Sequence, residues 1–277
     1  MRFPAAKSAN TIRGALGLAL RAGSAAAYER LFAPPRGMRG QPSGYADLPR
    51  PFVFRTAHLD NATFRPGEMF FFDIHLFDLR PGASGELEGA VREMAAAGIG
   101  PTRGRARWIS TERLELGGGA VPGDALAGAP LVVSLEPEAP PLGRVHARFV
   151  TATELKVAGG LAARPEFSIL FARLRDRLST LRALYGAGPI GIDFRTLGCR
   201  AEQVRLTDCR LEWANIERRS GRTGQVHPLG GFTGEAWYEG ELREFLPWLR
   251  ASRWTGGGRQ TVRGKGEVRV VSPAEAE

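Results

Sequence analysis

The strongest constraint on the fold is the order of apolar patterns in the second half of the chain. Residues 165–185 carry apolar side chains at helical spacing in one continuous stripe, which predicts an amphipathic helix. Alternating segments that are typical of strands lie before it (145–157) and after it (203–217 and 232–240). A shorter helix and a closing strand follow between residues 241 and 271. The resulting order, βαββαβ, predicts a ferredoxin-like unit.

The first half repeats this order without its first strand. The expected elements are a helix at 10–22, strands at 51–57 and 67–78, a helix at 86–98 and a strand at 103–116. Between Gly117 and Gly143 the composition shifts to Gly, Ala and Pro, which indicates a linker or irregular connection with one strand-like segment at 131–136. We therefore expect an α+β chain of two tandem ferredoxin-like (RRM-like) βαββαβ domains, the first lacking its usual first strand. Their predicted bounds are residues 1–143, including the linker, and residues 144–277.

The chain is strongly basic. It has 38 Lys and Arg against 29 Asp and Glu, a formal net charge of +9, and lysine occurs only at positions 7, 156 and 265. Arginine offers a planar fork of donors that pairs with phosphate and stacks on bases, so a basic chain of this kind favours a nucleic-acid partner. A GC-rich genome is the alternative explanation for the excess of arginine over lysine.

The cysteines and the hydropathy of the chain argue against a metal protein and a membrane protein. Cys199 and Cys209 form no CxxC motif, so we expect no metal and no cofactor, and we prefer buried free thiols to a disulfide across a hairpin. No segment approaches the ~18 apolar residues that a membrane span needs. The short apolar run between Arg13 and Arg21 is amphipathic and indicates a helix rather than a signal peptide. We expect a cytoplasmic protein without a membrane partner.

A basic, glycine-rich loop, TGGGRQTVRGKG (255–266), precedes the closing strand. Glycines let a backbone approach a ligand closely and leave N–H groups free, while Arg259, Arg263 and Lys265 add positive charge, and such nests hold phosphates. A dinucleotide site is disfavoured because a strand, not a helix, follows the glycines. A surface hairpin without a ligand is the alternative.

A series of stretches that covers nearly the whole chain carries a resemblance to a known family. Three of them are NTIRGALGLALR (10–21), GIGPTRGRARW (98–108) and GRQTVRGKGEVRV (258–270). In this order they resemble the LRGxxGxxL helix, the GxGxxRxRF stretch and the G-x-G ending of CRISPR-associated RAMP proteins, specifically precursor-crRNA processing endoribonucleases with tandem ferredoxin-like domains. Arg259 stands where members usually have Lys. The family's first strand, a cysteine cluster and a His before the loop are missing here.

The resemblance implies CRISPR RNA maturation by metal-independent endoribonucleolytic cleavage of precursor crRNA within its repeats. The 2′-OH would attack the adjacent phosphate, leaving a 2′,3′-cyclic phosphate, and the product would stay bound. The implied partners are the precursor crRNA or crRNA repeat and, in some systems, other CRISPR effector subunits. A non-catalytic RNA-binding RAMP subunit and a structural RAMP subunit of an effector complex are the alternatives, and cleavage separates the first hypothesis from these two.

Such a cleavage needs a base near the 2′-OH, an acid near the leaving 5′-oxygen and positive charge around the phosphorane. Histidine titrates in the suitable range, and we rank His227, in a basic segment, before His58, in a loop. His75 is expected to be structural, and His146 is ambiguous. Tyr28, Trp237 or Tyr238 could stack on bases. The residues expected to contact RNA are Arg259, Arg263, Lys265, Gly257, Gly258, Gly264, Gly266, Arg218, Arg219, Arg222 and Arg13.

Overall fold

The computed structural model describes most of the chain. The described residues are 1–34, 48–121, 128–137, 142–157, 160–215, 217–219, 226–228 and 230–271, with backbone alone for 217–219 and 226–228. The chain divides into two compact units, which are described one at a time. Unit 1 comprises residues 1–133 and 181–188, and unit 2 comprises residues 134–180 and 189–277. Among the described residues, no helix combines the length and the hydropathy needed to cross a membrane.

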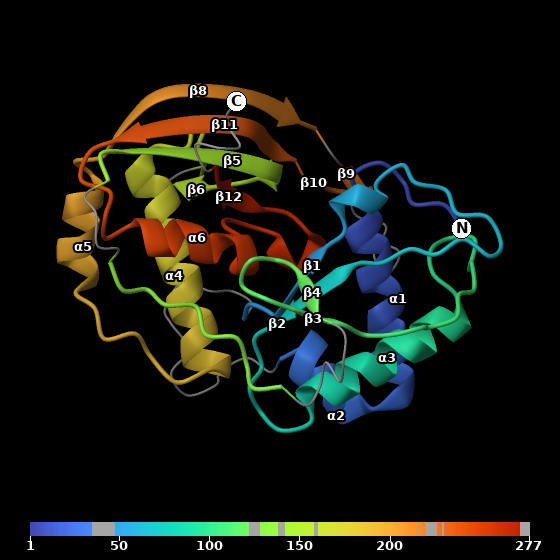
Figure 1. Ribbon diagram of the computed structural model, residues 1–277. Coiled ribbons are helices and arrows are strands. Elements are labelled where there is room, and N and C mark those ends of the chain that lie inside the picture. The colour runs from blue at the N-terminus through green and yellow to red at the C-terminus, as the bar shows by residue number, and fades with distance from the viewer. Residues whose placement is uncertain are drawn as a thin grey trace. The chain divides into compact units, whose positions relative to one another are not determined.

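Unit 2 is built on a four-stranded antiparallel sheet with the strand order β12–β5–β11–β8 (Figure 1). Its strands are β5 (Arg144–Thr153), β8 (Arg205–Ala214), β11 (Gly231–Glu239) and β12 (Val268–Val270). Its helices are α4 (Phe167–Tyr185), whose last residues from 181 on belong to unit 1, α5 (Phe194–Ala201) and α6 (Leu246–Thr255). The predicted ferredoxin-like order is confirmed, because α4 joins β5 to β8, β8 pairs with β11, and α6 leads to β12. Helix α5 is an addition that the sequence did not predict.

The core of unit 2 lies between this sheet and helices α4 and α6, which cover one of its faces (Figure 1). On β5, Val145, Ala147 and Phe149 are buried, while the residues between them are more exposed. From α4, Phe167 and Phe171 enter the core with 1% exposure or less, at the spacing that the sequence stripe predicted. The alternation along the strand therefore leaves the opposite face of the sheet to polar side chains.

Two short hairpins extend unit 2. The first pairs β6 (Lys156–Val157) with β7 (Gly160–Leu161), and the second pairs β9 (Glu217–Arg219) with β10 (Val226–Pro228). The single-turn helix η3 (Thr261–Arg263) lies within the glycine-rich loop.

Unit 1 contains two main helices and one strand pair. Helices α1 (Ser8–Gly23) and α3 (Ala83–Ala97) pack against each other, and β1 (Phe52–Arg55) pairs antiparallel with β2 (Asp73–Leu76). The smaller elements are α2 (Ala25–Ala27), the π-helix η1 (Tyr28–Phe32), the 3₁₀ helix η2 (Ala57–Leu59), β3 (Arg113–Leu114) and β4 (Ala120–Val121).

The first unit departs from the expected strands in three places. Residues 1–3, where no strand was expected, pair with residues 62–64, since Arg2 bridges Thr63 and the Phe3 amide donates to the Ala62 carbonyl. The strand expected at 103–116 is wrong for most of its length, because only Arg113 and Leu114 are in a strand and they pair with β4. The segment 131–136 forms no strand.

Both cysteines are free, as expected, but they are not both buried. Cys199 on α5 is exposed, and Cys209 on β8 is half-buried against the core of unit 2. The expectation of buried thiols is therefore wrong for Cys199, because it lies on a short helix whose outer face meets solvent.

Candidate functional site

The glycine-rich loop connects α6 to β12 in a conformation that requires glycine. Gly256, Gly258, Gly264 and Gly266 all have positive φ, between +70° and +75°. Only glycine adopts this region without steric cost. Space is equally restrictive, since a Cβ on Gly258 would lie 2.3 Å from the carbonyl oxygen of Glu154, and one on Gly266 would lie 1.9 Å from a backbone oxygen. The loop is therefore tightly packed against β5 and its own backbone.

Many of the loop's amides are used inside the protein. The Gly257 N–H donates to the Gly266 carbonyl (2.7 Å), the Arg259 N–H to the Glu154 carbonyl (3.0 Å) and the Gly266 N–H to the Ala152 carbonyl (3.1 Å). Three further loop amides donate to backbone carbonyls, those of Gly256, Arg263 and Gly264. The expectation of free amides is wrong for these six groups, because the tight turns of the loop direct them toward carbonyls.

The basic side chains of the loop differ in exposure. The Arg259 guanidinium donates to the Glu154 carboxylate at 2.5 Å, and the Arg259 side chain is 56% exposed while that of Glu154 is 4% exposed. This bond fixes the position of the guanidinium, and since it uses one of five N–H donors, the exposed side chain has others that can bind a ligand. Arg263 is half-buried, and Lys265 is only 6% exposed. Arg259 is thus the basic residue of the loop best placed to meet a phosphate.

The open face of the unit 2 sheet carries a linked polar row. The rings of His146 and Trp237 stack across β5 and β11, with centroids 4.4 Å apart, and the Arg210 guanidinium carbon lies 5.3 Å from the Trp237 centroid. The His146 Nε2 lies 3.3 Å from the Glu235 carboxylate, and Arg148 donates to Glu235 at 2.8 Å. The hydrogen bond from Arg148 is the main cause that lowers the pKa of Glu235. Since Trp237 already stacks with His146 and lies beside a guanidinium, this arrangement does not favour it as a base platform.

Of the two histidines ranked as catalytic candidates, His58 is the one whose side chain is described. It lies exposed on η2 in unit 1, its ring stacks on Phe71 (4.5 Å, 22°), and its Nε2 lies 2.9 Å from the Phe71 carbonyl oxygen. Because a carbonyl oxygen only accepts, Nε2 carries the proton and Nδ1 of the neutral ring holds the lone pair. This is a tautomer that can accept a proton at Nδ1.

His227 belongs to unit 2, so the two candidates lie in different units. Its backbone is part of β10 and pairs with Arg218 of β9, which is followed by Arg219. The third basic residue expected in this segment, Arg222, lies outside the described residues. The backbone pairing therefore brings His227 and Arg218 into one hairpin.

Arg13 and Tyr238 were also expected to contact RNA, and the structure describes the surroundings of both side chains. The Arg13 guanidinium carbon on α1 lies 4.4 Å from the centroid of the Phe32 ring, which also stacks on Tyr28. Tyr238 is wholly buried and its hydroxyl donates to the Pro165 carbonyl, so it cannot stack on a base. Among the described residues, no group of three or more His, Cys, Asp or Glu side chains could hold a metal ion.

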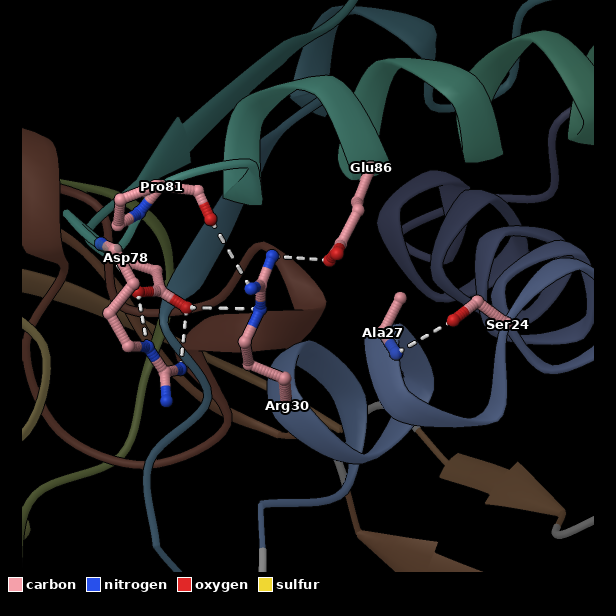
Figure 2. Close-up of polar contacts among 7 residues, drawn as sticks. Ser24, Ala27, Arg30, Asp78, Pro81 and Glu86 are labelled. Atoms are coloured by element: carbon pink, nitrogen blue, oxygen red, sulfur yellow. Dashed lines mark hydrogen bonds and ion pairs between the residues drawn. The ribbon is translucent and has the colours of Figure 1, made fainter.

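Unit 1 contains an ion cluster that the sequence analysis missed (Figure 2). The fully buried Asp78 carboxylate accepts two hydrogen bonds from the Arg80 guanidinium (2.7 and 2.6 Å) and lies 3.8 Å from Arg30. Arg30 also pairs with Glu86 on α3. Because the two cations and two carboxylates compensate one another, the cluster joins the loop after β2 to the π-helix and to α3 rather than offering a free charge.

Comparison with protein-family models finds a match for the second half of the chain. Residues 147–268 match the family model described as CRISPR-associated endoribonuclease Cas6. These residues are therefore similar to Cas6 endoribonucleases, and the match covers less than half of the chain. A second family model, described as an N-terminal domain, matches residues 1–124. A comparison with curated protein sequences gives no match.

Solved structures of Cas6 proteins share the fold along the length of the chain. A product complex of Cas6 from Thermus thermophilus has a TM-score of 0.59 and 18% identity, covering 98% of this chain and 95% of that one. A second Cas6 product complex has a TM-score of 0.50 and 18% identity, covering 80% and 85%. At this level of identity the likeness establishes the fold, an α+β arrangement of tandem ferredoxin-like type.

Proposed function

We propose that this chain matures CRISPR RNA by cutting the precursor transcript within its repeats. The observation that supports the proposal is the match of residues 147–268 to the Cas6 endoribonuclease family, on a unit with the ferredoxin-like strand order. The strong positive charge of the chain suits a polyanionic substrate. The T. thermophilus relative is described as a product complex, which accords with retention of the cut RNA here.

The cleavage proposed is an internal transesterification without a metal ion. The 2′-oxygen forms a bond to the adjacent phosphorus while its proton passes to a base, and the bond from phosphorus to the 5′-oxygen breaks as that oxygen takes a proton. The products are a 2′,3′-cyclic phosphate and a 5′-hydroxyl. His227 is the first candidate for the proton transfer and His58 the second.

Positive charge must offset the extra negative charge of the phosphorane. We assign this role first to Arg259, whose exposed guanidinium is anchored by Glu154. Arg263, Lys265, Arg218 and Arg219 are the further candidates.

The test is incubation of the purified protein with the repeat RNA in EDTA, followed on a denaturing gel. A single cut that survives EDTA and disappears with a 2′-deoxy substitution at the cut site is expected. Each histidine is then tested separately, with His227→Ala and His58→Ala compared with His75→Ala as the matched control. A catalytic role predicts a loss of at least 100-fold in single-turnover rate for one of the first two and little change for the control.

The same experiment decides between the nuclease and a binding subunit. Tight, salt-sensitive binding without any cut would contradict the enzymatic proposal and identify a non-catalytic RNA-binding protein. Retention is measured separately, by native gel after complete cleavage, where the product is expected to migrate with the protein.

A further inference from the structure

Unit 1 carries three exposed arginines at alternate positions, Arg103, Arg105 and Arg107, which we name the arginine ridge. Arg103 lies in the turn after α3, and Arg105 and Arg107 follow it, all within the segment that the sequence predicted as a strand. Here the chain alternates in burial although it pairs with no neighbouring strand from residue 105 to residue 112. The alternation has another cause, which is that the intervening residues are each held in place.

A tight turn holds the start of the ridge. Ile99 and Gly104 exchange both backbone hydrogen bonds, at 2.9 and 3.1 Å, and the Arg103 amide donates to the Gly100 carbonyl. Arg103 has a φ of +47°, which is uncommon for a residue with a side chain. The turn therefore fixes the backbone of Arg103 at the end of a closed loop.

The residues between the arginines anchor the rest of the segment. Gly104 abuts Met1, since a Cβ on Gly104 would lie 3.1 Å from the Cβ of Met1. The Ala106 amide donates to Ala95 at the end of α3 (2.9 Å), and the Trp108 ring lies 3.9 Å from the guanidinium carbon of Arg92 on α3. With positions 104, 106 and 108 held inward, positions 103, 105 and 107 face solvent.

Several exposed arginines elsewhere in the described structure pair with carboxylates, as Arg148 does with Glu235 and Arg200 with Glu244. In the part of the chain that the structure describes, no carboxylate pairs with any of the three ridge arginines. Arg2, also exposed, adds a fourth positive charge beside Met1.

We propose that the arginine ridge of unit 1 binds the phosphate backbone of RNA, in addition to the glycine-rich loop of unit 2. A row of like charges without carboxylates repels itself, and a polyanion with regularly spaced charges relieves this repulsion. Arginine forks bind phosphate oxygens bidentately, and backbone contacts of this kind position the RNA without reading its sequence. The proposal rests on the proposed function, since that function supplies the RNA.

The experiment measures the affinity of the full-length protein for fluorescein-labelled repeat RNA, blocked at the cut site by a 2′-deoxy substitution, by anisotropy between 50 and 400 mM salt. The variant carries Arg103→Gln, Arg105→Gln and Arg107→Gln. Three lost phosphate contacts flatten the slope of log K against log salt by about 2–3 and weaken binding roughly 100-fold at 0.1 M salt. The effect is the same for an oligouridine of equal length, because backbone contacts carry no sequence information.

The matched control removes three other exposed arginines for which the described structure gives no side-chain partner, by Arg21→Gln, Arg195→Gln and Arg205→Gln. It changes the net charge equally, so a local site predicts a much smaller effect. A ridge variant with lysines at the three positions keeps the positive charge, so it should retain most of the slope of log K against log salt. A purely structural role of the arginines would not predict this rescue by lysine.

Two results would overturn the proposal, and they differ. If wild-type protein binds no repeat RNA, the proposed function fails and the ridge proposal fails with it. If wild-type protein binds but the ridge variant keeps its affinity and salt slope, or matches the control triple variant, the ridge alone is refuted and an acidic protein surface becomes its better partner.

Discussion

The Gly266→Ala substitution tests the idea that the glycine-rich loop is built by close packing. Gly266 has a φ of +71°, and a Cβ there would lie 1.9 Å from the Gly257 carbonyl oxygen, which belongs to backbone and cannot swing away. Placing alanine in the left-handed region costs about 1–2 kcal/mol. The clash also breaks two backbone hydrogen bonds, from the Gly257 amide to the Gly266 carbonyl and from the Gly266 amide to the Ala152 carbonyl, each worth about 1 kcal/mol. The expected loss is about 3–4 kcal/mol.

The assay is urea unfolding followed by circular dichroism, with thermal unfolding as a second reading. A loss of this size is a large part of the roughly 5–15 kcal/mol that stabilises a domain, and it lowers the melting temperature by about 10 °C. Gly143→Ala is the matched control in the same unit, because no atom lies within 4 Å of the added Cβ and its φ is not positive. If the two variants differ by less than 0.5 kcal/mol, a threshold of about the usual error for surface changes, the packing argument is refuted.

Three further predictions concern unit 1. Asp78→Asn removes the carboxylate from the buried cluster and should cost about 2–4 kcal/mol, toward the lower end because the Arg80 side chain is 43% exposed, as measured by urea unfolding. Burial raises the pKa of Tyr185 to about 12, so its contribution to stability is complete below about pH 10, the ordinary value, and is lost as the pH rises toward 12. Tyr185→Phe should flatten this alkaline loss while costing about 1 kcal/mol at pH 7, since the hydroxyl donates to Pro49, and a steep loss in the variant would count against it. Gly14→Ala on exposed α1, where the new Cβ meets nothing, should stabilise the unit by about 0.5–1 kcal/mol, and a loss of stability would show that the position is not free.

The periodic parts of the fold could be predicted from the sequence. The stripe on α4 and the alternation on β5, β8 and β11 are local patterns, and each predicted element lies within a few residues of its observed place. The prediction of a third strand in unit 1, at residues 103–116, was wrong for most of its length, and the reason is physical. Residues 103–108 alternate because a turn and the end of α3 hold every second residue, and this alternation looks the same in sequence as that of a paired strand.

The candidate site was harder to predict than the fold. The glycines and Arg259 could be identified because a dense run of glycine and basic residues is visible in sequence. Glu154 could not, because its carboxylate meets Arg259 only after the sheet has brought residues 105 positions apart together. The Asp78 cluster has the same origin, since Arg30 and Asp78 belong to separate elements and no periodicity relates them.

The strand order of unit 2 has a consequence for how the chain folds as it is made. Strand β5 lies between β12 and β11, and Glu267 bonds to Thr151 across 116 positions, so one edge of β5 is covered only when the last described strand has been synthesised. At about 5–20 residues per second, a ribosome leaves that edge unpaired for several seconds or longer. An unpaired edge is a template for wrong pairing with other chains. The nascent protein should therefore be most exposed to aggregation, and most in need of a chaperone, until its glycine-rich loop and β12 emerge.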